Sequence, residues 1–362
     1  MEQNSTLYAD IISFDWENVL IAYDSGSAGF VRLTLEPGNM EFDSVEASGN
    51  GRFAVSGLEP ETAYTAEISS TDGKKVLSFT TLPAPECEET GSFALISDPH
   101  VAGKKENRKG RFFVESAMLL KEALQKCSDM GIRQVIMPGD ITNHGEEAEY
   151  CNCREIFKTF PGEIVAIPGN HDIVTDLWDE YFGCRSCETL LPGGHKLIAV
   201  DTSGKKLSDA DAGMIERAID RDGRAIITSH YQFYNSPVIT HSGPKANIIS
   251  NFAERAGLLE KIAASRSILY VGHQNITSVT GIGNAVQINL PQIPQFPCGF
   301  IRVRCFGNAW YHDFIPIDSE VLRQWSRRAG DAAAEFYKEP QWRAVYRVGR
   351  GAEESNFVLN IG

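Results

Sequence analysis

The feature that most restricts the fold is an alternation of short apolar runs with segments of helical pattern, which begins at Ser92. Helices are predicted near residues 114–127 and 146–160. The apolar runs are predicted strands, at residues 93–97, 134–137, 164–167, 197–200, 225–228 and 268–271. Such runs lack polar alternation, as is typical of strands buried on both faces under covering helices. The sequence therefore predicts an α/β core.

The flanking parts of the chain follow other patterns. Residues 275–315 alternate as strands do, and we expect these strands to complete a second sheet. Residues 319–338 predict a helix in a C-terminal cap. Residues before about 85 form short alternating runs separated by Gly, Pro and Asn, which predicts an all-β domain. With a proline-stiffened linker at residues 80–85, the predicted domains are 1–85, 86–318 and 319–362.

The first of these domains resembles fibronectin type III domains over part of its length. The resemblance rests on residues 57–68, Gly-Leu-Glu-Pro-Glu-Thr-Ala-Tyr-Thr-Ala-Glu-Ile. It implies that the hydroxyl of Tyr64 bonds upstream backbone, and that Trp16 lies where an early core tryptophan is common.

Composition limits the classes of protein and of partner. The chain has 362 residues, 42% hydrophobic and 23% charged, as in ordinary globular proteins. It starts without a secretory signal and contains no apolar stretch of membrane-spanning length, so the expected location is the cytoplasm. A formal net charge of −14 disfavours a protein that grips extended nucleic acid. A small phosphorylated partner fits this balance better.

Eight cysteines would remain thiols in a reducing compartment. Cys151 with Cys153, and Cys184 with Cys187, have spacings that a structural zinc site also uses. Buried thiols are the simpler interpretation, because short spacings of this kind also arise by chance.

Potential metal ligands follow five of the predicted strands. Each residue alone has an ordinary explanation, such as a helix cap, a turn or a satisfied core histidine. Taken as a set in chain order they predict one site, because ligands in an open α/β fold converge where strands end. The ligand-type residues are Asp98, His100, Asp140, Asn170, His171, Asp172, His230, His273 and Asn275.

The chemistry of this set favours two divalent cations. A carboxylate is needed to bridge two neighbouring ions, and Asp140 is the natural candidate. Mixed His, Asp and Asn ligands leave coordination positions open for water and a phosphoryl oxygen. Such ions would neutralise phosphate charge and acidify a bridging water into a hydroxide that attacks phosphorus in line.

The ordered motifs, from Asp98 to Asn275, resemble those of the calcineurin-like metallophosphoesterase superfamily. The resemblance implies an α/β fold in which a β-sandwich is flanked by helices in four layers, α/β/β/α. It implies that Asp98, His100 and Asp140 hold one metal and that Asp140, Asn170, His230 and His273 hold the other. It also implies that His171 faces the substrate, as transition-state stabiliser or proton donor. Mn, Fe and Zn are the expected metals.

Two positions depart from commoner family motifs. Asn275 stands where many relatives have a second His on the first metal, and it either ligates through its amide oxygen or points away. Asn143 stands where protein phosphatases of this superfamily have an Asp that orients the catalytic His. Asn can hold the ring without stabilising its charge, so the proton-donor role of His171 is expected either to be weaker or to be supported by Asp172 or His144.

The sequence restricts the subfamily and the substrate less than it restricts the metal ligands. Purple acid phosphatases place a Tyr ligand where Asn143 stands and a Gly where His100 stands, so this chain looks more like the bacterial phosphodiesterase and phosphatase branch. The basic loop at residues 104–111 would attract phosphate or be merely solvated. Among the aromatics after His230, Phe233 is expected in the core, whereas Tyr231 and His241 stay open.

The interpretation favoured here is a metal-dependent hydrolase of phosphate mono- or diesters. The alternative is a catalytically weak phospho-ligand-binding or scaffold protein of the same fold, which the loss of several ligands would favour. A DNA nuclease would share the metal site but is disfavoured by the overall acidity.

Overall fold

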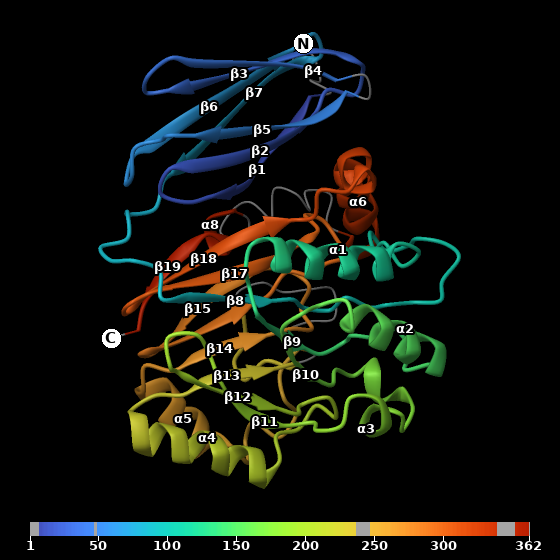
Figure 1. Ribbon diagram of the computed structural model, residues 1–362, viewed down its shortest axis with the longest axis vertical. Coiled ribbons are helices and arrows are strands. Elements are labelled where there is room, and N and C mark those ends of the chain that lie inside the picture. Colours follow the sequence, from blue (N-terminus) through green and yellow to red (C-terminus); the bar gives the residue numbers. More distant parts are fainter. Residues whose placement is uncertain (1–6, 47–48, 237–246, 339–351, 362) are drawn as a thin grey trace.

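The computed structural model describes residues 7–46, 49–236, 247–338 and 352–361, as two β-rich regions stacked along the long axis (Figure 1). The N-terminal region has a three-stranded sheet facing a four-stranded one. The first sheet consists, in spatial order, of β1 (Tyr8–Phe14), β2 (Asn18–Asp24) and β5 (Asn50–Ser56). The second consists of β4 (Met40–Glu46), β3 (Gly29–Glu36), β6 (Ala63–Ser70) and β7 (Gly73–Thr80). Ile21, Leu33 and Ile68 are fully buried between the sheets, so an alternating apolar pattern forms this core.

Two residues of this region carried the fibronectin type III resemblance. The hydroxyl of Tyr64 accepts a hydrogen bond of 2.9 Å from the backbone N–H of Glu59, as the resemblance implies. Trp16 differs from the expectation, because its ring packs edge-on against Phe306 and Tyr311 outside the N-terminal core. Trp16 lies in the turn after β1, which faces the second region. The all-β character is confirmed, and the more specific resemblance stays a prediction.

The second region contains two six-stranded sheets packed face to face. The first consists of β10 (Glu163–Ile167), β9 (Gln134–Pro138), β8 (Gly91–Leu95), β17 (Gly299–Phe306), β18 (Ala309–Pro316) and β19 (Phe357–Asn360). The second consists of β11 (Cys187–Leu190), β12 (Lys196–Val200), β13 (Ile226–Ser229), β14 (Ile268–Val271), β16 (Ala285–Asn289) and β15 (Ser278–Ile282). Strands β8, β9 and β10 are parallel, as are β12, β13, β14 and β16.

Helices cover the outer face of each sheet. The first sheet packs against α1 (Ser116–Asp129) and α2 (Glu147–Phe157), and the second against α4 (Asp209–Asp222) and α5 (Ala256–Ala264) (Figure 1). Successive strand residues alternate between cores: Phe93 packs between the sheets, whereas Ala94 packs under the helices. This two-residue period explains the continuous apolar runs, and the four-layer α/β/β/α fold is confirmed.

The strands predicted in residues 275–315 join both sheets. Strands β15 and β16 complete the second sheet as expected, whereas β17 and β18 extend the first sheet beside β8. The predicted C-terminal helix is α6 (Glu320–Tyr337). Among described residues, no helix is long and apolar enough to cross a bilayer. The predicted domain boundaries remain a prediction.

Candidate metal centre

The predicted ligands come together where strands of both sheets end. Asp98 follows β8, Asp140 follows β9, and Asn170 follows β10, all in the first sheet. His230 directly follows β13, and His273 lies two residues beyond β14, both in the second sheet. Strands β8, β9 and β10 run parallel, and so do β13 and β14. Their carboxyl ends therefore lie at one end of the two facing sheets, and we call this end, with the ligand-type residues that follow the strands, the ligand edge.

Asp140 lies at the centre of this group. Its Oδ2 is 3.6 Å from Nε2 of His100, and its Oδ1 is 3.4 Å from Nε2 of His230. Ligand atoms of His100, Asp140 and His171 lie within 4.8 Å of one another, and so do those of Asp140, His230 and His273. The one carboxylate therefore belongs to two adjoining clusters, which is the geometry of a bridging ligand.

The cluster around His230 is closely connected. Nδ1 of His230 donates a hydrogen bond of 2.9 Å to the carbonyl of Pro138, which turns Nε2 toward the site. That Nε2 lies 3.1 Å from Oδ1 of Asn170 and 3.2 Å from Nδ1 of His273. A backbone carbonyl that fixes the tautomer of a histidine is a usual support for a metal ligand.

The cluster around His100 has more atoms without partners. Nε2 of His100 lies 3.9 Å from Oδ1 of Asp98, and the ring stands perpendicular to that of His171 at 4.7 Å between centroids. Among described residues, Nδ1 of His100 is buried without a hydrogen-bond partner, and so is Oδ1 of Asn275 in the loop after β14. A buried amide oxygen without a donor suits coordination to a cation.

Backbone strain is concentrated at this edge. Asp98, His100, Asp140, His273 and Asn275 all have positive φ, between 45° and 68°. This left-handed region is uncommon for residues other than glycine, and each such residue costs of the order of 1–3 kcal/mol. Five such residues at one place indicate a functional site, in which the direction of the side chains is kept although the backbone conformation is unfavourable.

The glycines of the motifs allow the loops to approach. A Cβ on Gly139 would lie 2.7 Å from Nδ1 of His230 and from the backbone N of Gly169. A Cβ on Gly169 would overlap the carboxylate of Asp140. Each Gly of these two motifs therefore leaves room for ligands from another strand.

Burial and mutual charge set the protonation of the cluster. Burial alone would lower the pKa of His230, but the charge and hydrogen bond of Asp140 outweigh it and raise that pKa to about 9. Burial also raises the pKa of Asp140, yet the neighbouring histidines hold it well below its ordinary value. Burial, with the charge of His230, lowers the pKa of His273 to about 3. Without metal, the cluster thus holds a proton on His230, where a cation would replace it.

His171 is oriented differently from the sequence-based expectation. Its Nδ1 donates a 2.6 Å hydrogen bond to the main-chain carbonyl of Asn143, while the Asn143 side chain lies 2.9 Å from the ring of His144. Nε2 of His171 is therefore the ring nitrogen that this bond leaves unused. Every residue has a main-chain carbonyl, so the identity of residue 143 gave no signal for this contact.

Asp172 supports the loops and not the imidazole of His171. Its carboxylate accepts hydrogen bonds from the backbone N–H groups of Ile141, Thr142 and Gly169 and from the Thr142 hydroxyl. Burial, followed by the charge of Asp140, raises its pKa to about 6. These bonds join the loops after β9 and β10, which carry Asp140 and Asn170.

The aromatic residues after His230 have distinct environments. Phe233 is buried in the core under α4 and α5, as expected. The ring of Tyr231 lies 4.2 Å from that of His273 between centroids, so it packs against a predicted ligand. His241 lies outside the described residues.

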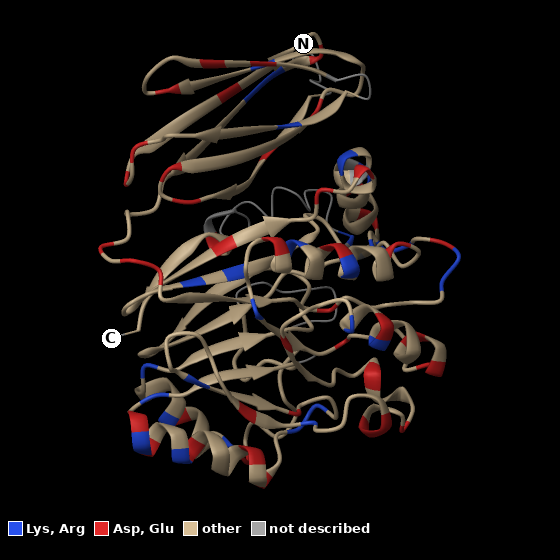
Figure 2. Cartoon of the chain, in the orientation of Figure 1, with Lys and Arg blue, Asp and Glu red and all other residues tan. Residues whose placement is uncertain are grey.

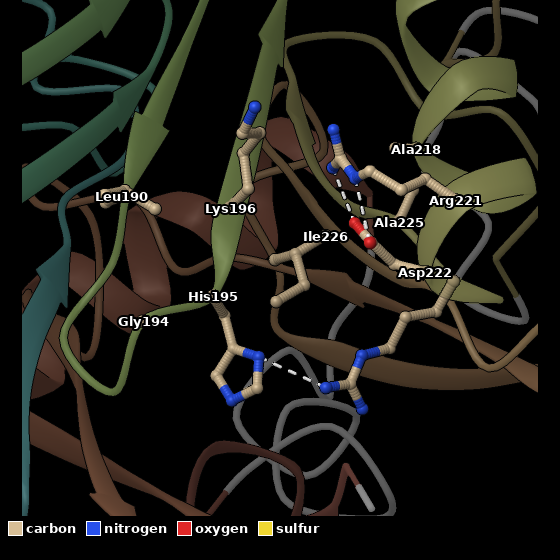
Figure 3. A pocket seen from close by; sticks show the side chains of 10 residues that line it. Leu190, Gly194, His195, Lys196, Ala218, Arg221, Asp222, Ala225 and Ile226 are labelled. Atoms are coloured by element: carbon tan, nitrogen blue, oxygen red, sulfur yellow. Dashed lines mark hydrogen bonds and ion pairs between the residues drawn. The ribbon is translucent and has the colours of Figure 1, made fainter.

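A separate hollow of about 460 Å³ lies at the other end of the second sheet from the predicted ligands, near the start of β12 and β13 (Figure 3). There Arg224 donates a 3.1 Å hydrogen bond to Nδ1 of His195, and Arg221 pairs with Asp222. None of the predicted ligands lines this hollow.

The residues at the ligand edge fit a pair of divalent cations. Carboxylate, imidazole and amide oxygen donors are grouped in two clusters with one shared carboxylate. One cluster has a histidine, His230, whose pKa is raised where a cation would stand, and Oδ1 of Asn170 lies 3.1 Å from that histidine. The arrangement defines a metallophosphoesterase centre.

Comparison with known proteins agrees with this class. The model of the family described as calcineurin-like phosphoesterase matches residues 91–273, and the chain belongs to that family. A dimetal phosphatase from Danio rerio is similar in structure, with 12% identity, a TM-score of 0.50, and coverage of 63% of this chain and 96% of its own. A purple acid phosphatase from yellow lupin seeds covers 86% of this chain and 72% of its own, at 11% identity and a TM-score of 0.47. A search of curated proteins found no match.

Proposed function

We propose that this phosphoesterase uses two divalent metal ions to hydrolyse a phosphate ester of a small molecule. Asp98, His100, Asp140 and Asn275 would hold the first ion, and Asp140, Asn170, His230 and His273 the second. Bound at these positions, the ions would neutralise phosphate charge and activate water. Mn, Fe and Zn suit the mixture of imidazole and oxygen donors.

His171 is the proposed acid for the leaving group. Its Nδ1 is engaged by the carbonyl of Asn143, so proton transfer would pass through Nε2, on the side of His100. Asp172 is a positioning residue in this scheme, because it holds the loops that carry Asp140 and Asn170.

The observation that carries this proposal is the position of Asp140 between the two clusters. One test combines metal analysis of protein purified without chelators with a panel of phosphate mono- and diesters assayed with added Mn²⁺. Hydrolysis that disappears on chelation and returns with metal supports the proposal. Full metal occupancy without hydrolysis of any ester would favour a binding protein of the same fold.

A further inference from the structure

The loop between β8 and α1 carries the basic residues Lys104, Lys105, Arg108, Lys109 and Arg111 (Figure 2). From this loop we propose that Arg111 is the residue that binds a nonbridging phosphate oxygen and gives the site a preference for phosphomonoesters. This inference rests on the proposed function and adds the substrate class to it.

The backbone of Arg111 is fixed from both sides. Its N–H bonds the carbonyl of Arg108 at 3.0 Å, and Arg111 forms an antiparallel bridge with Gln295. The next residue, Phe112, donates to the carbonyl of Pro294 at 2.7 Å. A guanidinium on an anchored backbone loses less conformational freedom on binding than one on a free loop.

The side chain of Arg111, in contrast, has no counter-charge in the described parts of the chain. Its Nε is buried without a hydrogen-bond partner, and no ion pair involves this side chain among the described residues. A buried N–H donor without a partner is costly, because it has lost water without gaining a hydrogen bond. Arg111 is therefore equipped to take an anion from outside the protein.

Backbone contacts place the segment of Arg111 beside the strand end of the first cluster. Arg111 bridges Gln295, and Gln292, three residues earlier in the same segment, forms a parallel bridge with Ser97, the residue before Asp98. The segment that anchors Arg111 also lies along the strand end that carries Asp98, since the N–H of Ile293 bonds the carbonyl of Ser97 at 3.3 Å.

The other cations of the loop differ in their surroundings. The ammonium of Lys109 lies 4.8 Å from the ring centroid of Phe336, which belongs to α6. Arg108 is exposed, and its side chain makes no hydrogen bond or ion pair within the described parts of the chain. Arg108 is therefore a matched control, with the same charge three residues away.

Phosphate chemistry connects Arg111 to the substrate class. A phosphomonoester has three nonbridging oxygens and is a dianion near neutral pH, whereas a diester has two and is a monoanion. Two metal ions and an additional guanidinium provide more positive charge and more ligands than a diester can use. A permanent cation beside the metal ligands thus favours the monoester.

The first part of the test measures binding of inorganic phosphate to the metal-loaded protein by calorimetry. Arg111→Ala should weaken binding by about 10- to 100-fold, as expected for a charge-assisted hydrogen bond, with two metals still bound. The phosphate affinity of Arg111→Lys should lie between those of the wild type and Arg111→Ala, because Lys keeps the charge but lacks the paired N–H donors of the guanidinium. Arg108→Ala should stay within about twofold.

Unchanged phosphate affinity in Arg111→Ala would overturn the inference, and so would an equal loss in Arg108→Ala. Loss of metal from both Arg111 variants would make the residue a support for the ligands and would also overturn it. If Arg111→Ala fails to fold, Arg111→Lys decides by the same criteria.

The second part compares kcat/KM for a monoester and a diester with the same leaving group. Arg111→Ala should lower kcat/KM for the monoester about tenfold more than for the diester, and equal losses would overturn the proposed preference. If the wild type hydrolyses neither ester, the proposed function fails, while the phosphate-binding result still tests Arg111.

Discussion

His230 and His312 are both fully buried, and Nδ1 of each contacts a backbone carbonyl, yet the groups around their Nε2 atoms differ. His230 stands at the ligand edge among Asp140, Asn170 and His273, and its pKa is raised to about 9. His312 lies within β18, and burial lowers its pKa to about 3. Nδ1 of His312 donates to the carbonyl of Trp310, while the Tyr270 hydroxyl donates to Nε2.

The difference separates two kinds of buried polarity. In the interior, a neutral histidine has both nitrogens satisfied and stacks on Phe357 at 4.3 Å between centroids. At the edge, charged groups are buried together on a backbone with positive φ. The interior is arranged for stability and the edge for chemistry, so variants in the two places should affect different measurements.

The largest expected effect at the edge is that of Asp140→Asn. Removal of the shared carboxylate should reduce ester hydrolysis by at least about 10³-fold and lower metal content, because both ions lose a charged ligand. Steady-state kinetics and metal analysis measure this. A matched interior variant, Ile288→Ala, should cost about 2–5 kcal/mol of unfolding free energy and leave metal content intact.

Full activity and two bound metals in Asp140→Asn would remove the bridging role of Asp140. Loss of metal from folded Ile288→Ala would contradict the expectation that interior variants affect stability and leave the metal centre intact.

His171→Ala should separate chemistry from metal binding within the edge. Turnover is expected to fall by roughly 10²–10⁴-fold, the range for a general acid, with metal occupancy nearly unchanged. Parallel measurements of kcat and metal stoichiometry test this. Since His171 lies in one of the two clusters of ligand-type atoms, loss of an ion would instead identify it as a ligand.

His312 should contribute a pH dependence to stability. Its pKa is about 3 in the folded protein and about 6.5 when unfolded, so the unfolded chain binds the proton first as pH falls. The contribution is complete above pH 6.5 and is lost progressively toward pH 3. At pH 5 the loss is of the order of 2 kcal/mol.

Urea unfolding at pH 7 and pH 5 tests this, with His312→Gln as the control because Gln does not titrate. The wild type should lose more stability between the two pH values than the variant does. Equal losses would mean that His312 becomes protonated in the folded protein.

Asn275 should give the smallest effect. If its unpartnered Oδ1 reaches the first ion, Asn275→Ala should weaken that ion by about tenfold, and Asn275→His should tighten it. Metal titrations of the chelator-treated wild type and both variants provide the measurement. Three superimposable curves would show that Asn275 points away from the metal.

The sequence was sufficient for the α/β layers and for the convergence of the site, because apolar runs and the residues that follow them are local signals. Pairing of β17 with β8 was not predictable in this way, since it depends on contacts about 200 residues apart. The contact of His171 with the carbonyl of Asn143 was equally hidden, because main-chain atoms are the same in every residue. Asp172 was placed near His171 by sequence proximity, whereas its carboxylate faces three backbone N–H groups.

The most direct test of the account is the metal stoichiometry of the ligand edge. Chelator-treated protein titrated with Mn²⁺ and followed by native mass spectrometry should take up two ions per chain, with ester hydrolysis rising as the second binds. Hydrolysis that is complete with one ion, or that persists with none, would contradict a two-metal centre built around Asp140.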